Sequence, residues 1–322
     1  MNEDSAATIL PFVRPGRAPP KKLPNRAKKV IAIGGGKGGI GKSLVSANLA
    51  QALAQRGARV VVVDLDLGGA NLHTCLGIAP PSVTLSDFVS HRVSSLDAAL
   101  VPTGLERLQL ISGASDALDA ANPKHAAKGR LMRHLRSLDA DYVLLDLGAG
   151  TGFNTLDFFL AADHGLVVLL PEPTSVENAY RFIKAAFFRK LQAVVRQETA
   201  ETVGRVLAGK DPELRNPWDC VARLRERDAQ AATELELALS GFHPFLVLNQ
   251  ARTRADFDVG ATVALAWKKF FGLELGTLGS IAYDEAVWQA VRARKPFLAH
   301  APESPAAHGL WRLAENLLSL AP

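Results

Sequence analysis

The sequence predicts an α/β fold: a doubly wound, mostly parallel sheet with helices on both faces. Short apolar runs of strand length, such as Arg107–Ile111 and Gly165–Leu170, alternate with stretches of helical periodicity, which is the order that a parallel sheet requires. Several of these runs end in glycines or acidic residues, and ligands collect at the carboxyl ends of such strands. The 322 residues, 48% of them hydrophobic, are enough for one large core.

The first element is an apolar strand at Val30–Ile33, followed by glycines and by a helix that we expect over Lys42–Gln55. The sequence between them fits the pattern G-x-x-x-x-G-K-[ST]. In that pattern, backbone N–H groups curl around phosphate oxygens at the start of a helix. The sequence therefore predicts a phosphate-binding loop, formed by Gly36, Lys37, Gly38, Gly39, Ile40, Gly41, Lys42, Ser43 and Leu44.

Two further strands end in acidic residues. Arg59–Asp66 is an apolar run that carries Asp64 and Asp66 at its end, and Tyr142–Asp146 is a third apolar strand that ends in an acid. A carboxylate at such a position can hold Mg²⁺ through water. Because the carboxyl ends of parallel strands meet at one edge of the sheet, we expect these acids to lie beside the phosphate-binding loop.

These motifs resemble those of the ParA/MinD family of deviant-Walker-A P-loop ATPases, which have a SIMIBI-type P-loop NTPase fold. Lys37–Ser43 is similar to the deviant Walker A motif, Asp64–Asn71 to switch I and Asp146–Gly150 to switch II. Pro171–Thr174 follows a strand, as in the MinD-like flagellar-number regulator (FlhG/FleN) branch. Leu278–Asp284 is similar to a family segment that usually reads G-x-I-P-x-D.

The resemblance implies ATP and Mg²⁺ as cofactors and an ATP-dependent homodimer. In that mechanism Lys37 reaches the phosphates of the partner's nucleotide, much as an arginine finger does, and Lys42 contacts the β- and γ-phosphates. Asp66 orients or deprotonates the attacking water. The residues implied at the metal are Ser43, Asp64 and Asp146.

The resemblance also implies an adenine site. Asn249 closes the strand Phe245–Asn249 at the position where the family reads adenine, and Asp284 lies in the G-x-I-P-x-D-like segment. Ala282 stands where that segment prefers proline. The sequence therefore departs from the family pattern beside Asp284.

The function implied is that of a slow ATP hydrolase, a switch for spatial positioning or number control of a flagellum, pole complex or chromosome. A protein activator or cargo is expected as a partner. The alternatives are another P-loop ATP-dependent enzyme on the same fold or a non-catalytic, nucleotide-dependent scaffold. An iron–sulfur carrier would need a C-x-x-C pair, whereas Cys75 and Cys220 stand far apart.

Residues 1–29 form a basic, proline-rich segment that we expect to be a disordered tail, ahead of a P-loop ATPase domain over 30–322. The tail holds seven basic and two acidic residues, which accounts for the net charge of +5 of the whole chain. Such a tail can rest on anionic lipid or bind DNA without sequence specificity, or simply aid solubility. With two cysteines and neither a signal peptide nor a spanning run, we expect a cytoplasmic protein, peripheral at a membrane, a pole or the nucleoid.

A helical insert is expected at about 190–242, where turn residues at 209–212 separate two helical stretches and predict a helical hairpin. Aromatic residues at helical spacing lead into it and indicate either core packing or a docking surface. A C-terminal helix with an apolar stripe at 306–318 has few basic residues on its polar face. That composition favours core packing over membrane contact.

Overall fold

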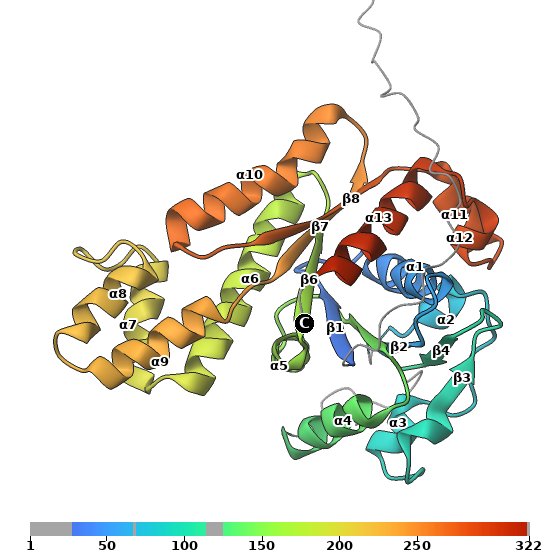
Figure 1. The fold of residues 1–322 in the computed structure, drawn as a ribbon, viewed down its shortest axis with the longest axis horizontal. Helices are drawn as coiled ribbons and strands as arrows, with labels where there is room; N and C mark the ends of the chain where they lie inside the picture. The colour runs from blue at the N-terminus through green and yellow to red at the C-terminus, as the bar shows by residue number, and fades with distance from the viewer. Residues whose placement is uncertain (1–27, 67–68, 114–124, 321–322) are drawn as a thin grey trace, which may run out of the picture.

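The computed structural model describes residues 28–66, 69–113 and 125–320. In this part of the chain eight strands form one sheet in the order β3-β4-β2-β5-β1-β6-β7-β8 (Figure 1). All neighbouring pairs are parallel except β3 with β4. The predicted doubly wound, mostly parallel sheet is confirmed. The strands are β1 (Lys29–Gly34), β2 (Val60–Leu65), β3 (Leu100–Pro102), β4 (Leu108–Ile111), β5 (Tyr142–Leu147), β6 (His164–Leu169), β7 (Phe245–Ala251) and β8 (Gly276–Ala282).

The central strands are buried on both sides, which explains their continuous apolar runs. Every residue of β2 and of β5 is buried. The two edge strands β3 and β8 lack such a run, and the periodicity did not predict them. β3 has only three residues, and β8 contains Gly276 and Gly279, which weaken the strand signal.

Helices cover both faces of the sheet (Figure 1). One apolar cluster packs beneath α1, α2 and α11–α13, and the other joins the sheet to α3–α10. On the first face lie α1 (Lys42–Gln55), α2 (Leu72–Cys75), α11 (Glu285–Arg292), α12 (Phe297–His300) and α13 (Pro305–Ser319). The second face carries α3 (Leu85–Val89), the short helix η1 (Leu96–Ala99), α4 (His125–Ser137), α5 (Phe153–Ala161), α6 (Pro173–Val194), α7 (Gln197–Leu207), α8 (Pro217–Arg225), α9 (Ala229–Ser240) and α10 (Arg254–Phe271).

The apolar stripe of α13 is part of the core. Leu310, Leu313 and Ala314 are fully buried, and Leu317 is almost so. Asn316 donates a 2.7 Å hydrogen bond to the carbonyl oxygen of Leu278 in β8. The prediction that this helix packs on the core is confirmed. Among the described residues no helix is both long and apolar enough to cross a bilayer.

The insert differs from a simple hairpin. α6 runs for 22 residues and is followed by three shorter helices, α7, α8 and α9, which group beside the far part of α6 in Figure 1. The second helical stretch, expected after the turn residues at 209–212, is broken at 226–228 into α8 and α9. Asp228 accepts a 3.0 Å hydrogen bond from Ala231 N–H and so starts α9 as a new helix.

Lysines of α6 hold the insert through the carbonyl ends of its helices. Lys184 Nζ donates a 2.8 Å hydrogen bond to Leu207 at the end of α7, and Lys190 Nζ donates to Gly241 at the end of α9. The fully buried Phe187 ring packs against Phe242, with centroids 5.3 Å apart and the ring planes tilted by 50°. Positive charge at a helix C-terminus is favourable. Within the aromatic stripe of α6, Phe187 is therefore a core residue, whereas Tyr180 is 37% exposed.

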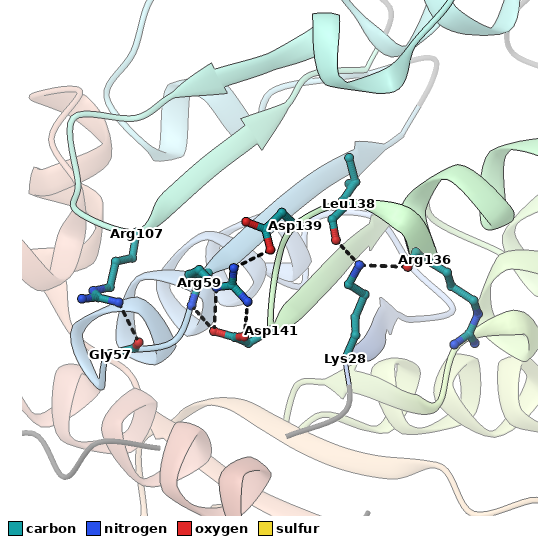
Figure 2. A network of polar contacts seen from close by, with 8 residues as sticks. All are labelled: Lys28, Gly57, Arg59, Arg107, Arg136, Leu138, Asp139 and Asp141. Carbon is teal, nitrogen blue, oxygen red and sulfur yellow. Dashed lines mark hydrogen bonds and ion pairs between the residues drawn. The ribbon is translucent and has the colours of Figure 1, made fainter. Parts of the chain in front are cut away.

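At the edge of the sheet where the parallel strands begin, a polar network joins the segments that precede β1, β2 and β5 (Figure 2). Arg59 forms ion pairs with Asp139 and Asp141, at 2.8 Å for Asp141. Lys28 donates to the carbonyl oxygens of Arg136, at 2.8 Å, and Leu138. These contacts set where the strands begin. The tail predicted over 1–29 lies outside the described residues, apart from Lys28 and Lys29.

Candidate functional site

The glycine-rich loop connects β1 to α1 at the carboxyl edge of the sheet. Gly41 is the N-cap of α1 and has φ 87°, in the left-handed region that glycine adopts without strain. Gly36 lies directly against α6, since a Cβ at this position would stand 2.0 Å from the carbonyl oxygen of Asn178. The loop is thus fixed on one side by α1 and on the other by α6.

Lys42 is buried within this loop. Its Nζ donates a 3.3 Å hydrogen bond to the carbonyl oxygen of Lys37, so the side chain folds back over the turn. Burial lowers the pKa of Lys42, while the negative charges of Asp146 and Asp66 act against that shift. The ammonium group therefore stays inside the loop with a backbone partner and keeps further N–H donors that could bond a phosphate.

Asp146 lies at the end of β5 and is 1% exposed. Its Oδ1 accepts a 2.9 Å hydrogen bond from the Ser46 hydroxyl, whereas no donor among the described residues reaches its Oδ2. Burial raises the pKa of Asp146 to about 7, with a smaller contribution from the charge of Asp64; hydrogen bonds from Ser43 and Ser46 oppose the rise. A buried carboxylate oxygen without a partner is costly unless a cation or water occupies the space beside it.

Asp64 is the direct neighbour of Asp146 in the β2–β5 register. Its Oδ1 accepts from Asp66 N–H at 3.0 Å, and its Oδ2 accepts from Leu72 N–H at 3.1 Å. Burial raises the pKa of Asp64 to about 6, against the hydrogen bonds from Leu72 and Asp66. The carboxylate of Asp64 therefore also organises the segment that follows β2, in addition to any contact with a cation.

The oxygen atoms available as metal ligands fit a hydrated Mg²⁺. Asp146 Oδ2 is unpaired and buried, Ser43 lies close enough to lower the pKa of the same carboxyl, and Asp64 adds a second carboxylate. The described part of the chain has no group of three or more His, Cys, Asp or Glu side chains that could enclose a metal. Magnesium with few protein ligands keeps most of its water and shares phosphate oxygens, which agrees with this arrangement.

Asp66 is half-buried at the start of the segment that follows β2. Its carboxylate faces the backbone after β5, because a Cβ on Gly148 would stand 3.3 Å from Asp66 Oδ1. The structure thus brings Asp66, Asp146 and Lys42 together on one side of the loop, where the charge of Asp66 acts on Lys42.

Lys37 lies at the outer side of the loop. Its Nζ is 3.7 Å from Glu172 Oε1, and both side chains are 47% exposed. Glu172 is the N-cap residue of α6. An ion pair this long and this exposed is weak, so Lys37 is available to other partners.

Asn249 and Asp284 make contacts that the sequence did not predict. Asn249 is 2% exposed and its amide Nδ2 donates to the carbonyl oxygen of Ile40 at 2.9 Å. Asp284 caps α11 through Ala286 N–H at 2.9 Å and reaches Ala306 N–H, at the start of α13, at 3.4 Å. Contact of either residue with adenine remains a prediction.

Two residues of this site were missed by sequence reasoning. Ser46 lies one turn beyond Ser43 in α1, on the side that faces β5, and helical spacing alone could have indicated it. Glu172 was noted only as part of a motif. Its contact with Lys37 depends on how α6 packs on the loop, which no local pattern reveals.

Comparison with protein families decides the relationship. The model of the ParA family, described as "NUBPL iron-transfer P-loop NTPase", matches residues 26–196, which is more than half of the chain. The chain belongs to the ParA family. The predicted resemblance to ParA/MinD P-loop ATPases is therefore confirmed.

Curated relatives of this ParA-family chain include two flagellar proteins. It is 39% identical over 157 residues to the antiactivator FleN of Pseudomonas aeruginosa. The matched region covers 48% of this chain and 55% of FleN. It is 36% identical over 167 residues to the flagellum site-determining protein YlxH of Helicobacter pylori, or 48% of this chain and 53% of YlxH. The chain spans about half the length of the curated relatives it matches. The predicted similarity to FlhG/FleN-type proteins is confirmed.

Solved structures share the fold over nearly the whole ParA-family chain. The septum site-determining protein MinD from Pyrococcus horikoshii, complexed with Mg-ADP, superposes with a TM-score of 0.60 and 24% identity. That match covers 90% of this chain and 96% of the MinD chain. At this identity the match shows the fold alone.

Proposed function

We propose that this chain is an ATPase that binds ATP with Mg²⁺ at the loop between β1 and α1, dimerises on ATP and hydrolyses it slowly. The observation that carries this proposal is the contrast between the two lysines. Lys42 is 7% exposed and folded onto the loop, whereas Lys37 is half exposed at its outer side. A buried lysine suits a phosphate of its own site, and a surface lysine suits a phosphate of a second molecule.

The residues divide the chemistry among them. Lys42 and the N–H groups at the start of α1 hold the phosphates, and Asp66 orients or deprotonates the attacking water beside them. Lys37 stabilises the charge that develops on the partner's nucleotide. The Ser43 hydroxyl would bind Mg²⁺, and Asp64 and Asp146 would hold its water shell. When bound, Mg²⁺ supplies positive charge that offsets the negative charge of the phosphates.

The cellular role we propose is positioning or number control of a structure such as a flagellum, a pole complex or a chromosome. The printed names of FleN and YlxH, an antiactivator and a flagellum site-determining protein, support the flagellar case. In this proposal the ATP-bound dimer acts in the cytoplasm and recruits a protein activator or cargo. Peripheral contact with a membrane or with DNA would depend on that partner.

Iron transfer is the second candidate, because the matching family description names it. A carrier of an iron–sulfur cluster holds the cluster by cysteine thiolates. Cys75 and Cys220 lie far apart in sequence, and burial raises the pKa of each, to about 12 and about 11. Thiols so reluctant to ionise are poor metal ligands, which favours the positioning role.

The test measures nucleotide binding and mass in solution. We expect Lys42→Ala to lose ATP binding and Asp66→Ala to bind ATP and remain a dimer on size-exclusion chromatography with light scattering. Asp97→Ala, an exposed acid on η1, is the matched control and should behave as the wild type. A wild-type protein that binds no ATP would contradict the proposal, and a monomeric Asp66→Ala protein would contradict the role given to Asp66.

A further inference from the structure

Asn249 lies at the end of β7 and reaches the phosphate loop. Its Nδ2 donates a 2.9 Å hydrogen bond to the carbonyl oxygen of Ile40, which immediately precedes the N-cap of α1. Both Asn249, at 2% exposure, and Ile40, also at 2%, are buried. A buried amide-to-carbonyl bond across 209 residues of sequence fixes the loop to a strand two places away from β1 in the sheet.

The Asn249 amide is also in close contact with the backbone of Gly41. A Cβ on Gly41 would stand 2.4 Å from Asn249 Nδ2, so the amide lies directly on the Gly41 backbone. Gly41 has φ 87°. Asn249 therefore touches the two residues that turn the loop into the first turn of α1, where the N–H groups that would face phosphate begin.

The other end of the Asn249 amide is also engaged. Its Oδ1 accepts a 3.0 Å hydrogen bond from Gln250 N–H. Gln250 has φ 59°, an uncommon conformation for a residue other than glycine, and the β7–β8 register shifts between Leu248 and Ala251. Bulges beside functional sites re-aim side chains. This one holds the Asn249 amide toward the loop and leaves neither end of it unbonded.

We propose that Asn249 is a positioning residue for the phosphate loop, acting through Ile40 and Gly41 on phosphate binding, in addition to any contact with the base. This inference rests on the proposed function, because it assumes that phosphate binds at this loop. It differs from the adenine-contact prediction in one respect. A loop-positioning residue affects every ligand that carries the phosphates, whatever base is attached.

The experiment compares ATP, GTP and tripolyphosphate, which has no base, as competitors of a fluorescent ATP analogue. We expect Asn249→Ala to weaken the binding of all three ligands, with about a tenfold loss for tripolyphosphate, the size expected for loss of a buried hydrogen bond. Asn316→Ala is the matched control, since Asn316 also donates to a backbone carbonyl, but in β8. It should leave all three affinities unchanged.

Weaker ATP binding with unchanged tripolyphosphate binding would overturn the inference and identify Asn249 as a base contact. Unchanged affinity for both would overturn it as well. Far-ultraviolet circular dichroism of Asn249→Ala guards against misfolding of this variant and should match the wild type.

A second measurement needs no nucleotide and so separates this inference from the proposed function. Amide hydrogen exchange of the peptide covering 36–45 should be faster in Asn249→Ala than in the wild type, and unchanged in Asn316→Ala. Equal exchange in all three proteins would overturn the inference even if the wild type binds ATP. A wild type that binds no ligand, together with faster exchange in Asn249→Ala, would contradict only the proposed function.

Discussion

Gly36 is a residue at which one added methyl group should have a large effect. A Cβ there would stand 2.0 Å from the carbonyl oxygen of Asn178 and 2.5 Å from its carbonyl carbon, and backbone atoms cannot rotate away. We expect Gly36→Ala to lower the free energy of unfolding by about 1–3 kcal/mol and to weaken ATP binding, because the loop must leave α6. Urea unfolding and an ATP titration measure the two effects.

The matched control for Gly36→Ala is Gly129→Ala. Gly129 is an exposed residue of α4 with no atom within 4 Å of its built Cβ. Alanine is the better helix former, so this variant should gain about 0.5–1 kcal/mol. If both variants unfold at the same urea concentration, the contact of Gly36 with α6 is not as close as described.

The residue types predicted the phosphate loop but not the tertiary contacts that hold it in place. The spacing of Gly36, Gly41, Lys42 and Ser43 follows directly from the pattern, since phosphate binding needs these groups in this order. The hydrogen bond of Asn249 to Ile40 joins residues far apart in the chain. Neither periodicity nor spacing shows which way an amide near the end of a strand points. The sequence therefore identified Asn249 as a candidate site residue but did not predict its hydrogen bond to Ile40.

At the scale of elements, Asp157 of α5 links three helices. It pairs with Lys128 of α4 and with Arg189 of α6 at 2.8 Å, and its side chain is 18% exposed. Burial works against ionisation of Asp157, but the hydrogen bonds from Arg189 and Lys128 outweigh it, and the pKa lies below its ordinary value. The charged form is therefore the one that stabilises the fold.

This predicts a specific pH dependence. A carboxyl whose pKa is lower in the folded protein contributes stability above its unfolded pKa of about 3.9 and loses it as the pH falls further. We expect Asp157→Asn to lower the free energy of unfolding by about 1–3 kcal/mol at pH 7. The difference from wild type should shrink below about pH 4, in urea unfolding measured across pH.

Asp139→Asn is the matched control for Asp157→Asn. Asp139 is also ion-paired, with Arg59, but its side chain is 87% exposed, and pairs of that kind contribute little. A difference between Asp157→Asn and wild type that stays constant down to pH 3 would contradict the lowered pKa.

The helices of the insert show where element prediction reached its limit. Turn residues at 209–212 were recognisable by type, and helical periodicity on both sides was clear. The break at 226–228 was not, because Asp228 in an otherwise helical stretch acts as a cap only once its side chain meets Ala231 N–H. The strand β8 was missed for a related reason, since its glycines conceal a strand that neighbouring β7 stabilises.

For the whole molecule the main prediction concerns the dimer. In the structure Lys37 pairs weakly with Glu172 of its own chain. We expect Lys37→Ala to bind ATP but remain a monomer, because the contact to the partner's phosphates is lost. Glu172→Gln, which removes only the intramolecular pair, should dimerise at the same or a lower ATP concentration. Light scattering across an ATP titration measures both, and a Lys37→Ala protein that dimerises normally would contradict the role across the interface.

The length of α6 has a mechanical consequence. Its N-cap residue, Glu172, lies beside Lys37, and its later turns carry Lys184 and Lys190, which hold α7 and α9. At 1.5 Å per residue, 22 residues make a rod about 33 Å long, so a tilt of about 5° at the loop sweeps the far end by about 3 Å. Dyes placed on α9 and α13 would therefore see, as a change in energy transfer, a rearrangement at the loop too small to detect where it originates.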